Sequence, residues 1–172
     1  MTSQMMVDLV PVDEAVLEDL LALAVAEARP GEVMPPAAGE TTTEPRTTWT
    51  DQRKEAFRDY HRRCRVSTQA PVAEVTWAVT AGGRIVGAAR LALVDDDPEG
   101  REVGLWLGES HRGQGISGEV AYWALAAAQT MDAKRLVART TVSNSMARRS
   151  LERIGFELAH SGSDLVGTIS LP

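Results

Sequence analysis

Three glycines in one ten-residue stretch have the spacing of a phosphate-binding loop. In HRGQGISGEV (residues 111–120), Gly113, Gly115 and Gly118 follow the pattern G-x-G-x-x-G. Glycine lets the backbone approach an anion closely, and a loop of this kind at the start of a helix gathers N–H groups and the positive end of the helix dipole at one point. The stretch therefore predicts a phosphate site, and a dinucleotide is the first candidate to consider.

The surroundings of this loop argue against a dinucleotide. The dinucleotide fingerprint belongs to the first of several strand–helix units and is followed, about 20 positions on, by an acidic residue. Here the loop lies two-thirds of the way along the chain, after segments typical of antiparallel hairpins, and the stretch at that distance reads VAR (residues 137–139). No G-K-[ST] follows the loop, which excludes a nucleotide-binding P-loop. A different phosphate-bearing cofactor is expected.

Two motifs in register resemble those of the GCN5-related N-acetyltransferases. RGQGIS (residues 112–117) is similar to the family's Q/R-x-x-G-x-G/A motif, with serine in the final small position. NSMARRSLERIGF (residues 144–156) is similar to its N-x-x-A/S-x-x-x-Y/L-x-x-x-G-F segment. The resemblance implies an α/β (α+β) fold with a mixed, mostly antiparallel central sheet of six to seven strands flanked by about four helices. It also implies a single domain over residues 1–172 that uses acetyl-CoA.

The resemblance further implies which residues bind acetyl-CoA. Strand backbone groups at residues 105–107 would contact the pantetheine and the thioester carbonyl, the amides of residues 113–118 the pyrophosphate, and Asn144 the pantetheine. The expected set is Leu105, Trp106, Leu107, Arg112, Gly113, Gln114, Gly115, Ile116, Ser117, Gly118 and Asn144. The family's usual general acid, a tyrosine, is replaced by Leu151, which leaves protonation of the thiolate to water or another group. With leucine at this position, the sequence resembles the branch of the family that contains the ribosomal-protein alanine acetyltransferases. The same branch includes several antibiotic-modifying enzymes.

Acetyl transfer to an amine needs a proton acceptor, because an alkylammonium is not nucleophilic. Glu102, on the strand REVGLWL (residues 101–107), is the first candidate base, and Glu74, on an earlier strand, is the second. Alternate residues of a strand share a face, so the side chains of Glu102 and Leu105 are expected on opposite faces of the strand unless a bulge intervenes. Either carboxylate could instead be a solvated strand residue. The single cysteine, Cys64, is assigned no role.

The remaining pattern predicts the elements that position these residues. Hydrophobic periodicity predicts helices, and the period-two segments with a Gly82-Gly83 turn predict strands. The expected helices cover residues 14–28, 49–65, the segment after the glycine loop, and 144–154; the expected strands cover residues 5–11, 74–80, 84–94, 101–107, 135–141, and the segments FELAH and DLVGTISL. His61 lies on an apolar helix face, where packing is the expected role. Residues 29–48, with four prolines and five threonines, predict either a lid or substrate-binding loop or a plain surface loop.

Composition narrows the range of partners. The net charge is −6, from 18 basic and 24 acidic side chains, which argues against binding to nucleic acid or to a membrane surface. One cysteine and three scattered histidines predict no metal site. The most apolar early run is too short and too charged to span a membrane, and no basic segment precedes it, so a cytoplasmic protein is expected. Whether it forms a homodimer stays open.

Three acceptors remain open at this point. The first is a small cationic amine such as an aminoglycoside, in line with the acidic balance, and with Trp49 and Glu109 as substrate-binding residues. WTDQRKEAFRDYHR followed by EVTWAV loosely resembles enzymes that acetylate the 2′-amine of aminoglycosides such as kasugamycin, which would imply antibiotic resistance. The second is a protein N-terminus, as the alanine acetyltransferase branch implies. The third is no acceptor at all: a non-catalytic acetyl-CoA-binding module, which the missing tyrosine allows.

Overall fold

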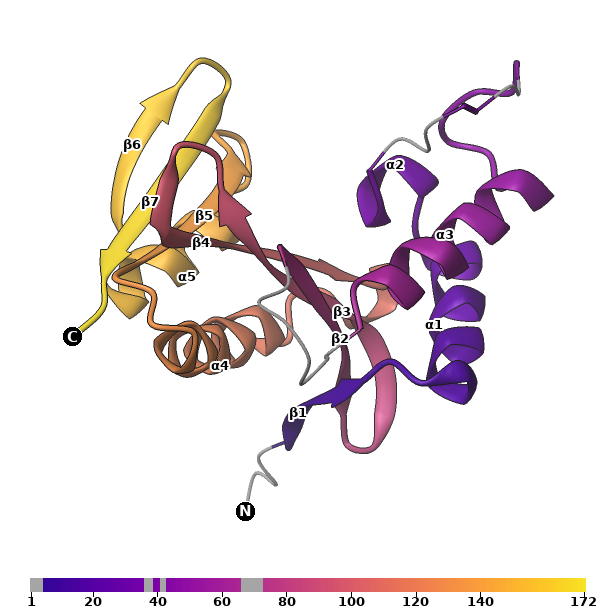
Figure 1. The fold of residues 1–172 in the computed structure, drawn as a ribbon, viewed down its shortest axis with the longest axis horizontal. Helices are drawn as coiled ribbons and strands as arrows, with labels where there is room; N and C mark the ends of the chain where they lie inside the picture. The colour runs from indigo at the N-terminus through magenta and orange to yellow at the C-terminus, as the bar shows by residue number, and fades with distance from the viewer. Residues whose placement is uncertain (1–4, 36–38, 41–42, 66–72) are drawn as a thin grey trace. The chain divides into compact units, whose positions relative to one another are not determined.

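The fold contains one mixed sheet whose strands are hydrogen-bonded in the order β1-β2-β3-β4-β5-β7-β6 (Figure 1). This computed structural model describes residues 5–35, 39–40, 43–65 and 73–172. Among the described strands, β4 and β5 pair in parallel, whereas β1–β2, β5–β7 and β6–β7 pair antiparallel.

The strands are β1 (Val7–Pro11), β2 (Glu74–Ala81), β3 (Arg84–Val94), β4 (Asp97–Leu107), β5 (Arg135–Thr141), β6 (Glu157–Ser161) and β7 (Asp164–Ser170). The helices are α1 (Glu14–Glu27), α2 (Pro30–Val33), α3 (Asp51–Arg63), α4 (Ile116–Thr130) and α5 (Ser145–Ile154), with a 3-10 turn η1 (Glu109–His111). The expected α+β architecture with a mostly antiparallel sheet is confirmed.

The chain divides into two compact units, which are described separately below. The first comprises residues 1–89 and 106–112, and the second comprises residues 90–105 and 113–172. Helices α4 and α5 belong to the second unit, and so does the point after Val103 and Ala138 where β4 and β5 stop pairing (the fork). Helices α1, α2 and α3 belong to the first unit.

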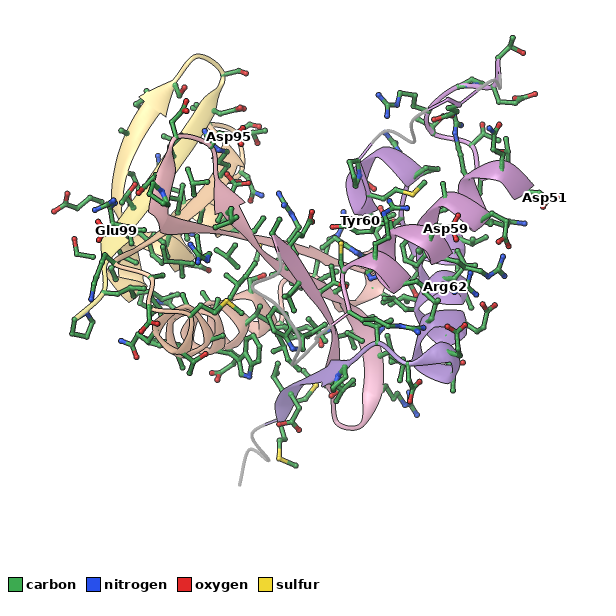
Figure 2. All side chains as sticks on the ribbon, in the orientation of Figure 1. Asp51, Asp59, Tyr60, Arg62, Asp95 and Glu99 are labelled. Carbon is green, nitrogen blue, oxygen red and sulfur yellow. The ribbon has the colours of Figure 1, made fainter. Side chains whose placement is uncertain are left out.

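In the first unit, α1 and α3 lie side by side (Figure 1). The Asp13 side chain accepts a hydrogen bond from the Val16 N–H (2.8 Å) and begins α1, and Thr50 begins α3 in the same way. The facing surfaces bury Leu17, Leu20 and Phe57 completely. Ion pairs follow the exposed side of the two helices, and Figure 2 shows two residues of this network, Asp59 and Arg62, whose charged groups lie 3.5 Å apart. The helix pair therefore combines a buried apolar seam with a charged outer edge.

In the second unit, β5 is paired with β7 along its whole length, residues 135–141 with 164–170. The β6–β7 hairpin (yellow in Figure 1) continues the sheet beyond it. Helices α4 and α5 pack on each other, and α5 ends at Gly155 with φ +104, a left-handed conformation that favours glycine. One edge of β5 is thus hydrogen-bonded to β7 over its whole length, whereas its other edge is paired with β4 only over residues 135–138.

Two elements differ from the sequence-based expectation. The short helix α2 lies inside the segment expected to be a loop. Pro30 at its first turn stabilises it, and so does the hydrogen bond that the Arg29 N–H donates to Glu32 Oε2 (2.8 Å). Strand β4 begins at Asp97 rather than at residue 101, because the turn before it takes only two residues, with Asp96 at φ +61. Figure 2 labels Asp95, in this turn, and Glu99, which lies on β4. The hairpin that contains β3 and β4 is therefore longer than its sequence pattern predicted.

His61 is a buried, neutral imidazole in the first unit, which confirms the expected packing role. It is 1% exposed, its Nδ1 lies 3.0 Å from Thr76 Oγ1, and its ring packs against Phe57 with centroids 4.5 Å apart. Its Nε2 has no hydrogen-bond partner among the described residues. Burial lowers the pKa of His61 from 6.5 to about 4, because a charged imidazolium would lose its hydration there.

Lowering the pH from 7.5 to 5 is expected to reduce the free energy of unfolding, with a contribution of about 2 kcal/mol from His61. The unfolded chain binds a proton at the ordinary histidine pKa, whereas the folded chain does not until the pH nears 4. The stabilisation is therefore complete above pH 6.5 and declines as the pH falls toward the folded-state value. Urea unfolding at several pH values measures this slope. His61→Gln should flatten it, whereas the same change at the exposed His160 should not; an equal slope in His61→Gln would contradict the assignment.

Candidate active site

The glycine loop leads directly into α4, as its spacing predicted. Gly113 and Gly115 have φ values of +74 and +81, which other residues rarely adopt. The side chains of Asp13, Thr50 and Asn144 cap α1, α3 and α5 respectively, whereas Gly115, at the start of α4, leaves that helix without a side-chain cap among the described residues. The first N–H groups of a helix without such a cap are suited to bind an anion.

The residues after Gly115 have different environments in the first turn of α4. Ile116 is buried, so its backbone is the part that can meet a ligand. The Gly118 N–H donates to the Gly115 carbonyl (3.1 Å). Ser117 lines a cavity, described next. Gln114 is exposed in the loop.

A cavity of about 200 Å³ lies where β4 and β5 separate. Residues 100–103 of β4 pair with residues 135–138 of β5, and the register ends there. The cavity is lined by residues 103–105 of β4, residues 138–140 of β5, the first turns of α4, and one face of α5. Leu105, Ser117 and Asn144, from three separate elements, are thus brought together. Separated strand edges offer unpaired backbone groups, which suit an extended ligand with amide groups.

The face of α5 that lines this cavity carries Asn144, Ala147 and Leu151. Asn144 Oδ1 accepts from the Ala147 N–H (3.1 Å), which caps the helix. Leu151 is buried and supplies no proton donor. Ser150, which lines the cavity as well, was not singled out from the sequence; only its place one residue before Leu151 could have indicated it.

Trp106 and Leu107 belong to the first unit, so of the strand residues 105–107 only Leu105 lines the cavity. Trp106 packs against the buried cluster around Leu17 and Phe57. The Leu107 carbonyl accepts from Arg112 Nε (3.1 Å), which orients the chain just before the glycine loop.

A carboxylate at the end of α1 holds the turn that precedes the loop. Glu27 Oε2 accepts from the Ser110 N–H (2.9 Å) and the Ser110 hydroxyl (2.7 Å). These bonds keep the pKa of the Glu27 carboxyl below its ordinary value. A Cβ on Gly108 would lie 2.7 Å from the same oxygen, so a side chain there would displace the Glu27 carboxylate from this position. Glu109, at the start of η1, is exposed. Sequence reasoning missed Glu27, because no local pattern links it to Ser110.

Glu102 lies between two arginines in the second unit. Its Oε1 accepts from Arg90 Nη2 (3.0 Å) and its Oε2 from Arg139 Nε (2.8 Å), and its side chain is 20% exposed. The Arg90 side chain crosses the face of Gly104, where a Cβ would lie 2.6 Å from Arg90 Nε. Glu102 is therefore a partly buried member of an ion-pair row rather than a solvated carboxylate.

The second candidate base and the expected substrate-binding tryptophan lie in the first unit. Glu74 on β2 accepts a hydrogen bond from the hydroxyl of Tyr60 on α3, which Figure 2 labels. The Trp49 indole donates to the Ala28 carbonyl (2.9 Å), and its ring meets Phe57 edge-on with centroids 5.8 Å apart. Trp49 thus joins the two ends of the segment between α1 and α3.

A known family of enzymes matches most of the chain that forms these elements. The sequence model of the acetyltransferase (GNAT) domain family matches residues 9–157. The chain belongs to this family. It is an acetyl-CoA-dependent N-acetyltransferase, as the two motifs in the sequence predicted, and acetyl-CoA is its co-substrate.

Solved structures of other acetyltransferases share the GNAT fold at low sequence identity. The ribosomal L7/L12 alpha-N-protein acetyltransferase RimL, in complex with coenzyme A, is 17% identical with a TM-score of 0.67, over 96% of this chain and 94% of that one. The spermidine/spermine N-acetyltransferase SpeG from Vibrio cholerae is 17% identical with a TM-score of 0.66, over 95% and 93%. The microcin C7 self-immunity acetyltransferase MccE, in complex with acetyl-CoA and AMP, is 14% identical with a TM-score of 0.67, over 96% and 92%. No curated protein matches the sequence significantly.

The residues of this GNAT chain fit acetyl-CoA in two respects. A pyrophosphate requires N–H donors, and the start of α4 provides them beside two left-handed glycines. Pantetheine is a narrow chain with amide groups, and the cavity between β4 and β5 has the unpaired strand edges such a chain can bond to. Within the part of the chain that the structure describes, no cluster of metal-ligating side chains occurs, and no helix is long and apolar enough to span a membrane.

Proposed function

We propose that this acetyltransferase acetylates a primary amine of a small cationic acceptor, an aminoglycoside being the leading example. In this proposal the pyrophosphate of acetyl-CoA binds at residues 113–118 and the pantetheine lies between β4 and β5. The observation that carries the cofactor assignment is the start of α4 without a side-chain cap, beside the cavity lined by Leu105 and Asn144. The acceptor assignment is supported by the net charge of −6. SpeG, whose name gives spermidine and spermine as its substrates, is a solved neighbour of the same fold.

The reaction joins the amine nitrogen to the acetyl carbon. The ammonium first loses a proton to a carboxylate or to water. The free amine then attacks the thioester carbonyl, which leaves the carbonyl oxygen negative and the nitrogen positive, and the nitrogen gives up a second proton to solvent. When the C–S bond breaks, this charge leaves with the coenzyme A thiolate, which then takes up a proton. Glu102 and Glu74 are the candidate proton acceptors. With Leu151 in place of the family's tyrosine, the thiolate proton comes from water or from a hydroxyl such as that of Ser150.

An acceptor panel tests this proposal. The panel contains aminoglycosides including kasugamycin, linear polyamines, and short peptides with free N-termini, and the measurement is thiol release from acetyl-CoA with the product identified by mass. Turnover with the cationic small molecules supports the proposal. Turnover with peptides alone would replace it with N-terminal acetylation of a protein. Acetyl-CoA binding without turnover on any member would support a non-catalytic binding module.

The Michaelis constant for a polycationic acceptor is expected to rise when the ionic strength is increased. Between 10 and 150 mM salt the Debye length falls from about 30 Å to about 8 Å, which weakens attraction between the acidic protein and its acceptor. The turnover number should change little, because salt screens the encounter more than the bound complex. A monoamine acceptor measured in the same buffers is the control. A constant that does not depend on salt would argue against the cationic acceptor.

A further inference from the structure

A row of three charged side chains crosses the second unit on strands β3, β4 and β5. Arg90, Glu102 and Arg139 come from successive strands, and Glu102 is bonded to both arginines at 3.0 and 2.8 Å. Gly104 has no side chain to obstruct the Arg90 stem, which lies across it. The row has one carboxylate and two guanidiniums, so it carries an excess positive charge.

Arg139 is the member of this row whose position on its strand lines the cavity; its side chain lies with Glu102 on the face of the sheet opposite to Ala138 and Thr140. It is the first residue of β5 after the last pair of the β4–β5 register, Val103 with Ala138. Its Nε is bonded to Glu102, whereas neither Nη atom has a hydrogen-bond partner among the described residues. Its side chain is 50% exposed. A cation with free donors thus lies where the two strands begin to separate.

The geometry of the fork indicates which part of acetyl-CoA reaches this point. The loop 113–118, proposed to hold the pyrophosphate, follows the carboxyl end of β4, and the unpaired edges run from there back toward Val103 and Ala138. A pantetheine chain entering between these edges brings its acyl end toward the closed end of the fork, next to Arg139.

We infer that Arg139 is a further catalytic residue, whose free Nη donors bind the acyl oxygen of acetyl-CoA, with Glu102 and Arg90 as positioning residues. This inference rests on the proposed function. When the amine nitrogen attacks, the C–N bond forms and the carbonyl π electrons move to the oxygen. Arg139 donates to that oxyanion until the C–S bond breaks and the electrons leave with the thiolate. A preorganised donor acts where the charge develops and so lowers the barrier.

This assignment changes the role of Glu102. Both its carboxylate oxygens accept guanidinium N–H groups, so that it orients Arg139 rather than receiving the substrate proton. Proton acceptance then belongs to Glu74 or to solvent water. The two roles predict different pH–rate profiles. If Glu102 is the base, its removal abolishes the acidic limb of the profile; if Glu102 only orients Arg139, the acidic limb remains.

Binding measurements test the inference without an acceptor. Arg139→Gln is expected to weaken acetyl-CoA by about tenfold, the value of one hydrogen bond to a charged group, while binding of coenzyme A, which lacks the acyl oxygen, is unchanged. Arg139→Lys should retain part of the difference. Arg135→Gln, four residues earlier on β5 and paired with Asp97 away from the cavity lining, is the matched control and should change neither ligand. Equal weakening of both ligands by Arg139→Gln would overturn the inference.

Kinetics provide the second arm. Arg139→Ala and Arg139→Gln should each lower kcat by about 10²-fold, and added guanidinium ion should restore part of the activity of Arg139→Ala. Glu102→Gln should lower kcat and keep the acidic limb of the pH profile. Near-parent kcat in Arg139→Gln, or loss of the acidic limb in Glu102→Gln, would contradict the assignment. A parent enzyme that acetylates no amine would instead refute the proposed function, and the comparison of acetyl-CoA with coenzyme A would still decide the role of Arg139.

Discussion

Arg53→Met is expected to lower the free energy of unfolding by about 3–5 kcal/mol, because it removes a buried cation from partners that cannot replace it. Arg53 is 3% exposed. Its guanidinium lies 2.6 Å from Glu40, donates to the Thr48 carbonyl (2.7 Å) and the Glu44 carbonyl (3.0 Å), and also bonds the Pro45 carbonyl. The variant would leave one carboxylate and three carbonyls without these donors. Thermal and urea unfolding measure the loss.

Lys54→Met is the matched control for this variant. Lys54 is the next residue on α3, and its ammonium lies 3.5 Å from Asp51 on the exposed side of the helix. Exposed pairs of this kind contribute little, about 0–1 kcal/mol. If the two variants lose equal stability, the role given to Arg53 is wrong.

Gly115→Glu is expected to weaken acetyl-CoA binding at least tenfold, about 1.4 kcal/mol. Space is not the obstacle, since no atom lies within 4 Å of the position of a Cβ on Gly115. The new carboxylate would stand at the start of α4, where it satisfies the same N–H groups and repels the pyrophosphate. The φ of +81 adds backbone strain for any residue with a side chain. Calorimetric titration with acetyl-CoA measures the change.

Gly162→Glu controls for the strain. Gly162 lies in the turn between β6 and β7 with φ +63, and it too has open space around a Cβ. The two variants add the same charge and a comparable backbone penalty, so a loss of affinity confined to Gly115→Glu reports on the loop. Equal affinity in a folded Gly115→Glu protein would exclude the pyrophosphate from residues 113–118. Tight binding of NAD to the parent would return the dinucleotide to consideration.

Local patterns predicted much of the framework, because backbone preference and hydrophobic period are properties of short segments. Strands 84–94 and 135–141 have the bounds that their alternation indicated, and Gly155 ends α5 as a left-handed residue. The glycine loop was placed at the start of a helix from its spacing together with the apolar period of the residues that follow it, and α4 begins there. The two family motifs supplied the fold class that no single segment could.

The contacts within the site could not be predicted in the same way. Glu102 was recognised as a carboxylate on the right strand, but its partners Arg90 and Arg139 depend on the register of three strands. Ser110 and Glu27 are 83 positions apart and meet only after α1 has packed. The helix α2 was missed because Pro30 and Gly31 favour turns as readily as a helical first turn. Pairing between distant side chains is set by tertiary packing, which the hydrophobic pattern does not specify.

If acetyl-CoA binds at the uncapped start of α4, as proposed above, we expect it to protect the enzyme from proteolysis. A glycine at the cap in place of a capping side chain costs only about a few tenths of a kcal/mol, and the ligand proposed for this site would supply the missing acceptor. Any ligand that binds only the folded chain adds stability in proportion to the logarithm of its concentration, about 2.7 kcal/mol at 100 times its Kd. Proteases that cleave transiently open chains act on the population that lacks this support. We therefore expect the ligand-free enzyme to be cleaved faster by proteases than the enzyme saturated with acetyl-CoA.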